Sequence, residues 1–126
     1  MKTKKPLFEQ KESYLHLHAK RVLADWLSDE YVKIVDEEKF CMCGHIWFVP
    51  DLTCYTEKGI KDLYEVVYTS YIDLFKLWRM HKYFDIHKWD VNVFTISAEW
   101  IMRQTKKPVS LELKLHLPES REIEPF

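Results

Sequence analysis

Glycine, cysteine and long apolar runs are all scarce in this sequence. Its two isolated glycines, Gly44 and Gly59, cannot build a glycine-rich phosphate loop or a dinucleotide fingerprint, which excludes the common nucleotide-cofactor enzymes. Its three cysteines cannot all pair within one chain, and this favours a reducing compartment, the cytoplasm. No uncharged apolar run reaches about 18 residues, and no apolar stretch follows the basic start of the chain, so we expect neither a membrane partner nor a secretory signal.

The charge of the chain is almost balanced. A formal net charge of -1 means that a polyanionic partner must be held by a local basic patch and not by the field of the whole molecule. The chain has 126 residues, and 47% of them are hydrophobic, which is enough for one compact core. We therefore predict a single domain over residues 1–126, with a flexible basic tip at 1–8 and a loose tail at 118–126.

The spacing of apolar residues predicts two long helices and one short one. Apolar side chains recur at intervals of three and four over residues 9–27 and again over 71–84, which is typical of amphipathic helices. A shorter helix is expected at 98–104. These helices would each bury one face against another layer of the protein.

Strands are predicted where β-branched and aromatic residues gather or where apolar and polar residues alternate. The predicted strands are 31–35, 46–55, 63–69, 91–96 and a late, half-buried strand at 109–117. The polar segment 56–62 contains Gly59 and predicts a hairpin between the second and third of them. The fold class is therefore α+β, a central mixed sheet flanked by helices, with the core order αβββαβ.

Two acidic residues on this hairpin carry the functional hypothesis. Asp51 follows Pro50 at one extended run, and Glu65 lies inside the next among apolar neighbours, where a carboxylate needs a partner or a role. A hairpin would bring both carboxylates to the same end of the sheet, and convergent carboxylates suit a hard cation such as Mg²⁺ or Mn²⁺. Such a metal polarises a phosphodiester and lowers the pKa of an attacking water.

The first helix offers an accessory face. Glu12, His16 and Lys20 stand at i, i+4 and i+8, so the three side chains point the same way. They would supply a third carboxylate and a cation to the acid pair. The alternative is a solvated helix face stabilised by side-chain pairs, just as Asp51 could cap a turn and Glu65 could face solvent.

This arrangement resembles the PD-(D/E)xK nuclease superfamily over roughly residues 12–100. Within that superfamily, the stretch Glu65-Val66-Val67-Tyr68-Thr69, followed by Arg79 and Tyr83 on the next helix, is similar to the CoiA-type competence nucleases. The resemblance implies a restriction-endonuclease-like fold and a metal-dependent nuclease that hydrolyses phosphodiester bonds in DNA. It also implies the catalytic roles. Asp51 and Glu65 would bind Mg²⁺ (or Mn²⁺) with the backbone carbonyl of Val66, Glu12 would assist directly or through water, and Arg79 would face the site or the phosphate backbone.

The sequence departs from the family pattern at one position. The superfamily usually has lysine two residues after the acid, and CoiA-like members tend to have glutamine, whereas this chain has Val67. Valine cannot orient water or stabilise developing charge. A migrated lysine would restore the function, and Lys20 ranks before Lys76 because it shares the helix face of His16. Otherwise the chain is a nuclease-like fold that has lost catalysis and serves as a nucleic-acid-binding or assembly module, or an unrelated α+β interaction protein.

The second long helix carries a possible nucleic-acid contact. Lys76, Arg79 and Lys82 recur every three residues and form a stripe that could follow a phosphate backbone or simply face solvent. Several aromatic residues flank this region. Most are expected in the core, and one or two could stack on the bases of a single strand. They are Trp47, Tyr55, Tyr64, Tyr68, Tyr71 and Trp78.

Two further features yield weaker expectations. Cys41, Cys43 and His45 alternate on one predicted strand and would share a face, a chemically suitable set for zinc, but the spacing lacks a second cysteine pair and ordinary free thiols are expected. The late strand at 109–117 could pair with a second subunit as easily as with its own sheet, and a homodimer is one option by analogy with small enzymes that cut both DNA strands.

Overall fold

The computed structural model describes residues 7–68 and 73–117, with side chains from residue 14 onward. The tail predicted at 118–126 and most of the tip predicted at 1–8 lie outside the described residues. The tip was placed two residues too far along the chain, because the first helix already begins at Leu7.

The described residues form three helices. They are α1 (Leu7–Leu27), α2 (Leu74–Ile86) and α3 (Ala98–Arg103). The side chain of Asp73 caps α2 by accepting a hydrogen bond from the Lys76 backbone, and Ser97 caps α3 in the same way through Trp100. These caps fix where each helix starts, and the start of α2 matters below because it positions Lys76.

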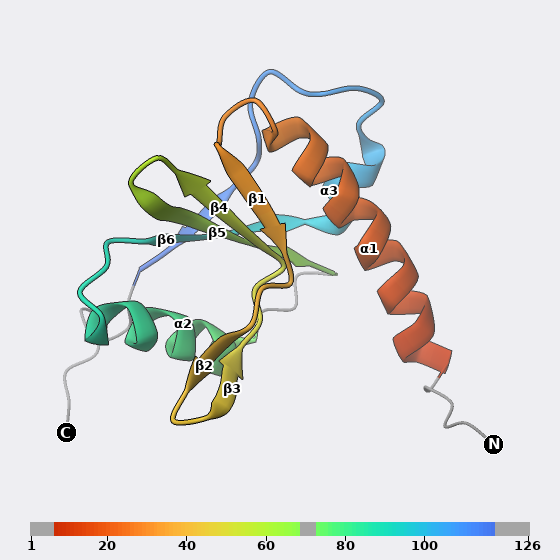
Figure 1. Ribbon diagram of the computed structural model, residues 1–126. Helices are drawn as coiled ribbons and strands as arrows, with labels where there is room; N and C mark the ends of the chain where they lie inside the picture. Colours follow the sequence, from red (N-terminus) through yellow and green to blue (C-terminus); the bar gives the residue numbers. More distant parts are fainter. Residues whose placement is uncertain (1–6, 69–72, 118–126) are drawn as a thin grey trace.

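Within 7–68 and 73–117, seven strands form two sheets. The strands are β1 (Lys33–Asp36), β2 (Phe40–Met42), β3 (His45–Phe48), β4 (Leu52–Thr56), β5 (Gly59–Val67), β6 (Asn92–Ser97) and β7 (Lys114–His116). The main sheet has the order β1-β4-β5-β6-β7, and only the β5–β6 pair is parallel. The second sheet is the β2–β3 hairpin, which projects below the main sheet next to α2 (Figure 1).

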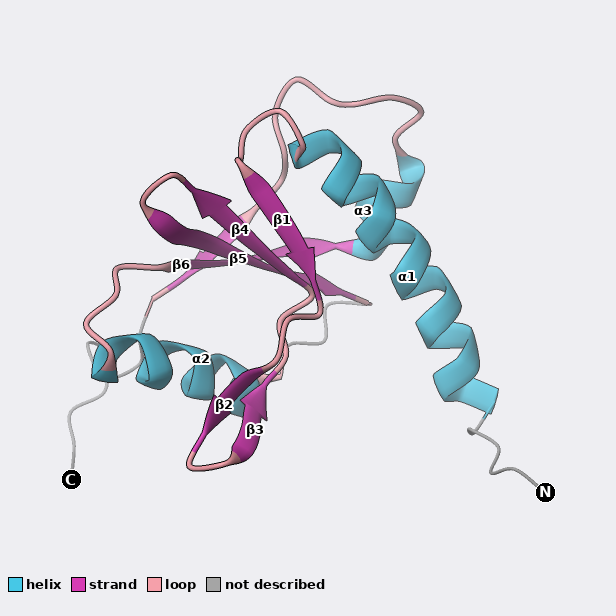
Figure 2. Ribbon diagram, viewed as in Figure 1, coloured by secondary structure: helices cyan, strands magenta, loops and turns pink. Residues whose placement is uncertain are grey.

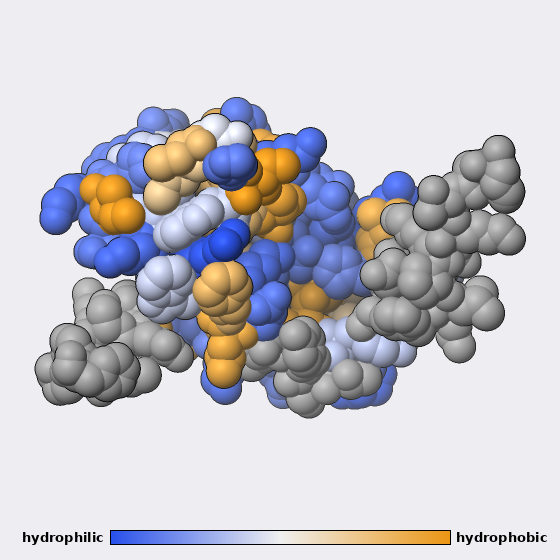
Figure 3. All heavy atoms as spheres, turned by 90° about the horizontal axis from the view of Figure 1, so that it is seen from below, coloured by the Kyte–Doolittle hydropathy of each residue, from blue (hydrophilic) through white to orange (hydrophobic). Residues whose placement is uncertain are grey.

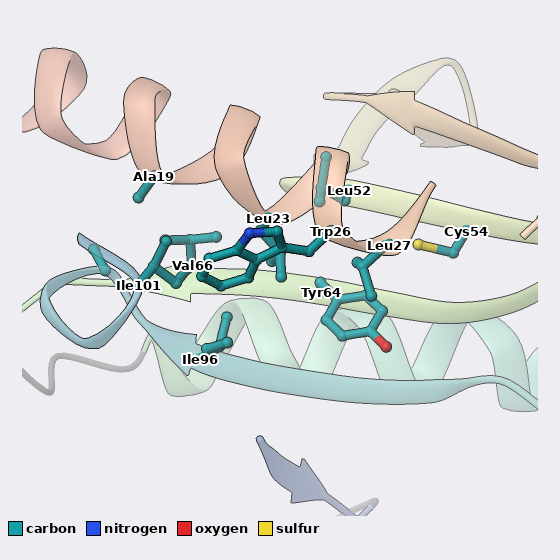
Figure 4. Packing of buried hydrophobic residues seen from close by; sticks show 11 residues of the cluster. Ala19, Leu23, Trp26, Leu27, Leu52, Cys54, Tyr64, Val66, Ile96 and Ile101 are labelled. Atoms are coloured by element: carbon teal, nitrogen blue, oxygen red, sulfur yellow. The ribbon is translucent and has the colours of Figure 1, made fainter. Parts of the chain in front are cut away.

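The two faces of the main sheet are covered by different elements. Helices α1 and α3 lie on one side, and α2 with the β2–β3 hairpin lies on the other (Figure 2). On the first side, Leu23 and Trp26 of α1 pack against Tyr64 and Val66 of β5 (Figure 4). On the second side, buried α2 residues such as Met80 pack against sheet residues of opposite parity. Because successive strand residues point to opposite faces, β5 contributes alternately to both cores.

The predicted α+β class, a central mixed sheet flanked by helices, is confirmed. With the β2–β3 hairpin set aside, the chain runs α1, β1, β4, β5, α2, β6, which is the predicted order of a helix, three strands, a helix and a strand. The late strand is much shorter than 109–117, since only Lys114–His116 pair, and they pair with β6 of the same sheet. No helix in the described ranges has the length and apolar character needed to cross a membrane.

The prediction that Cys41, Cys43 and His45 share one strand face is wrong. Cys43 and Gly44 form the turn of the β2–β3 hairpin, both with positive φ, at 55° and 80°. This pair of left-handed residues is typical of the tight turns that join antiparallel strands. Cys41 therefore lies on one strand and His45 on the next.

Candidate active site

The hairpin formed by β4 and β5 brings Asp51 and Glu65 together. Leu52 pairs with Tyr64, so the next residue outward on each strand is Asp51 on one side and Glu65 on the other. The Asp51 backbone N–H donates to Glu65 Oε2 at 2.9 Å, and the Val66 N–H donates to Asp51 Oδ2 at 2.7 Å. Their side chains are only 10% and 13% exposed. Neither carboxylate is directed into bulk water.

Strand parity explains why Glu65 is buried without entering the α1 core. Tyr64 and Val66 point toward α1, so Glu65 points to the face that α2 covers. There the Lys76 ammonium lies 2.8 Å from Glu65 Oε1. The Asp73 cap holds Lys76 in the first turn of α2, at the height of the Glu65 carboxylate. A strand acid and a helix cation thus meet across the sheet–helix interface.

Helix α1 contributes His16 to the same site. His16 Nε2 lies 3.0 Å from Asp51 Oδ2, so the ring donates to the oxygen that also accepts from Val66. The hydrogen bond to Asp51 raises the pKa of His16 above its ordinary value, although burial of the ring acts in the opposite direction. The imidazole therefore orients the Asp51 carboxylate.

Burial and the charge of Asp51 raise the pKa of Glu65 to about 7, while Lys76 opposes both effects. Two carboxylates in a nearly dry site repel each other, and one of them retains a proton close to neutral pH. A divalent cation could replace that proton, because it neutralises both charges at once.

Main-chain geometry adds an oxygen to this set. The N–H and C=O of one strand residue point toward the same neighbouring strand. Because the Val66 N–H points to Asp51, the Val66 carbonyl faces that side too, next to the place where β4 has not yet begun. Asp51, Glu65 and the Val66 carbonyl therefore border one spot at the end of the sheet.

Lys20, which was ranked first as the migrated lysine, is paired with two acids outside the Asp51–Glu65 pair. Its ammonium lies 2.6 Å from Asp36 Oδ1 and 2.8 Å from Glu37 Oε2, in the turn after β1. Burial lowers the pKa of Lys20, but the two acidic partners outweigh it and the net pKa is raised. One helical turn, about 5.4 Å along the axis, separates Lys20 from His16, so sharing a helix face does not mean sharing a partner.

The remaining residues of the accessory face on α1 and of the basic stripe on α2 have separate surroundings. Glu12 lies in the first part of α1, before residue 14, where the side chains are outside the described part of the structure. Arg79 does not continue a free basic stripe, since its Nη1 donates to the Trp47 carbonyl at 2.8 Å and ties α2 to β3. Lys82 is exposed. Of the three residues in the predicted stripe, Lys76 is the one that reaches the acid pair.

The site can be compared with clusters of metal-binding side chains and with a cavity elsewhere in the molecule. Among the described residues, no three or more His, Cys, Asp or Glu side chains are arranged to hold a metal ion. A cavity of about 740 Å³ lies at the opposite end of β4 and β5, lined in part by Thr56, Lys58 and Trp89. Of these two places, the acid pair is the one that combines buried carboxylates, a raised pKa and a paired cation, which are typical features of functional sites.

No family model, curated protein or solved structure matches this chain.

Proposed function

We propose that this protein is a metal-dependent nuclease that hydrolyses phosphodiester bonds in DNA. The observation that carries the proposal is the buried pair of Asp51 and Glu65, which is joined by direct hydrogen bonds and flanked by a lysine. The helix, three strands, helix and strand that hold this pair follow the order of the PD-(D/E)xK core. The free thiols of Cys41, Cys43 and Cys54 fit a reducing compartment, and we propose the cytoplasm as its place of action.

The donor set suits Mg²⁺ or Mn²⁺. Mg²⁺ is usually held by one or two carboxylates, with water and substrate phosphate completing its octahedron, so a third acidic side chain is not required. Asp51 and Glu65 would bind the ion, and the Val66 carbonyl would complete that edge. A bound divalent cation polarises the phosphodiester and lowers the pKa of the attacking water.

The chain's own residues prepare the site for this ion. The Val66 N–H and His16 both bond to Asp51 Oδ2, which fixes the carboxylate and leaves Oδ1 without either of these two bonds. Glu65 is held at one oxygen by the Asp51 backbone and at the other by Lys76. Such outer contacts orient ligating groups and tune how strongly they bind.

Lys76 takes the role that Val67 cannot fill. In the family pattern the lysine lies two residues after the acid, on the same side of the strand. Here α2 covers that side of the strand, and the ammonium of its Lys76 contacts Glu65. With Glu65 holding a cation, the Lys76 ammonium would be available to a substrate phosphate, where it would stabilise the charge that develops in the transition state.

The test is cleavage of labelled single-stranded, duplex and branched DNA with Mg²⁺ or Mn²⁺, with EDTA as the blank. We expect metal-dependent cleavage that Asp51→Asn and Glu65→Gln each reduce by at least about a hundredfold. Glu57→Gln, in the turn between β4 and β5, removes an exposed carboxylate and serves as the matched control. Cleavage that survives both site substitutions would refute the proposal.

A second function is favoured by one observation. Lys76 and His16 already occupy oxygens of the two acids, and Val67 stands where the family has lysine or glutamine. A site closed in this way fits a nuclease-like fold that binds nucleic acid, or assembles with other proteins, without cutting. Salt-sensitive DNA binding with no cleavage under any metal would select this alternative.

A further inference from the structure

A cluster of aromatic rings lies beside the acid pair and is not used by the mechanism above. Phe75 and Trp78 on α2 stack in parallel, with ring centroids 6.1 Å apart and planes 6° from each other. Trp47 of β3 lies next to them, 6.0 Å from Trp78. We call these three residues the aromatic platform.

The platform is exposed although its rings are large and apolar. Phe75 is 62% and Trp78 is 41% accessible, whereas the core side of α2 is formed by other residues, such as Leu77 and Met80. Figure 3 looks at the side of the molecule where α2 and the β2–β3 hairpin lie, and it shows apolar residues scattered among hydrophilic ones on this surface. Exposed clusters of large apolar side chains commonly mark binding sites.

Arg79 holds the platform in shape. Its guanidinium carbon lies 4.7 Å from the centre of the Phe75 ring and 5.3 Å from that of Trp47. Its hydrogen bond to the Trp47 carbonyl links helix to hairpin. The rings are therefore pre-arranged, so a ligand that stacks on them does not first have to order them.

The platform lies directly beside the candidate active site in the chain. Phe75 precedes Lys76, and their Cα atoms are about 3.8 Å apart. Lys76 in turn touches Glu65. Phe75 is therefore the sequence neighbour, in the first turn of α2, of the residue that contacts the acid pair.

We propose that the aromatic platform stacks unpaired bases next to the phosphate that is cleaved, so that the substrate class of this site is single-stranded DNA. This inference rests on the proposed nuclease function. Rings combined with cations are typical of single-strand binding, where aromatic side chains take the bases and basic residues follow the backbone. Lys82 lies one turn beyond Trp78 and supplies such a cation. In a duplex the bases are stacked on each other and cannot reach the rings.

The test separates stacking from phosphate binding. Binding of a fluorescein-labelled thymidine 12-mer is measured by anisotropy in EDTA, beside an abasic 12-mer of equal charge and a blunt duplex. We expect Trp78→Leu and Phe75→Leu to weaken binding of the thymidine strand by about tenfold each, and to leave the abasic strand unchanged. Trp78→Phe keeps an aromatic face and should recover most of the binding. Trp89→Leu removes an exposed tryptophan beyond the far end of α2 and should have no effect.

Each outcome decides the proposal. Equal binding of the thymidine and abasic strands, preference for the duplex, or equal effects of Trp78→Leu and Trp89→Leu would overturn it. Binding to neither strand would also overturn it and leave the platform as a protein-docking surface. Metal-dependent cleavage together with binding that does not depend on the bases would support the nuclease function and refute base stacking on the aromatic platform. Binding that depends on the bases, without cleavage, would support base stacking and refute the nuclease function.

Discussion

The raised pKa of Glu65 predicts that the folding stability of the protein depends on pH. In the native state burial and Asp51 raise the pKa of this group from its ordinary 4.5 to about 7, so the folded protein binds the proton more tightly than the unfolded chain. The resulting stability is fully present below pH 4.5 and is lost as pH rises through about 7. The pKa of His16 is also raised, and it acts in the same direction above pH 6.5.

The size of the effect follows from the change in pKa. At about 1.4 kcal/mol per pKa unit, a rise from 4.5 to about 7 corresponds to about 3 kcal/mol of folding free energy lost between weakly acidic and alkaline pH. Glu65→Gln carries no titrating proton, so its stability should exceed that of the original protein increasingly as pH rises. Asp51 would then no longer face a second carboxylate.

Urea unfolding from pH 5 to 8.5, followed by tryptophan fluorescence, measures the difference between the two proteins. Glu57→Gln is the control and should follow the original protein at every pH. At pH 8, Mg²⁺ should stabilise the original protein and not Glu65→Gln, because the ion binds the folded site with both acids charged. Parallel stability curves for Glu65→Gln and the original protein would refute the reasoning, since they would mean that Glu65 titrates alike in both states.

Two further predictions concern the lysines. Lys76→Met should abolish cleavage. Adding Val67→Lys to that variant should restore part of the cleavage, because position 67 lies on the Glu65 side of β5. A cleavage assay with both variants tests this expectation, and full activity of Lys76→Met would contradict it. Lys20→Met should cost only about 1 kcal/mol in urea unfolding, because Asp36 and Glu37 are 60% and 59% exposed and remain hydrated without their partner; a loss of several kcal/mol would mean that this buried cation holds α1 in place.

Local pattern was enough to predict most elements of the fold. The helical spacing of 9–27 corresponds to α1, and the glycine-containing segment 56–62 contains the turn between β4 and β5. The late strand failed because alternation shows only that a strand would have one apolar face. It does not show that a neighbouring strand is long enough to pair with it, and β6 pairs only with 114–116. The cysteine prediction failed because a turn at Cys43 interrupts what looked like one strand.

The acid pair was predictable because both acids belong to one hairpin. A hairpin brings both residues to the same end of the sheet without knowledge of any helix, whereas their exact register also depends on a β-bulge between Cys54 and Tyr55 that the turn does not reveal. Their partners required the packing of helices onto the sheet. Nothing local distinguishes Lys76 from the other lysines of its helix, or shows that the Trp47 carbonyl would bind Arg79.

The partners of Lys20 show which physical quantity the sequence leaves open. Residues four positions apart on a helix point in about the same direction around its axis, and this holds for His16 and Lys20. The height of each residue along the axis relative to the sheet depends on where the chain turns after β1, and there Asp36 and Glu37 meet Lys20 first. A buried ammonium with two acidic partners is not free to serve a third site. Adjacent acids that follow a strand are therefore a competing destination to weigh before a helical lysine is assigned to a catalytic centre. In this chain that competition leaves Lys76, delivered by a capped helix start, as the cation of the site.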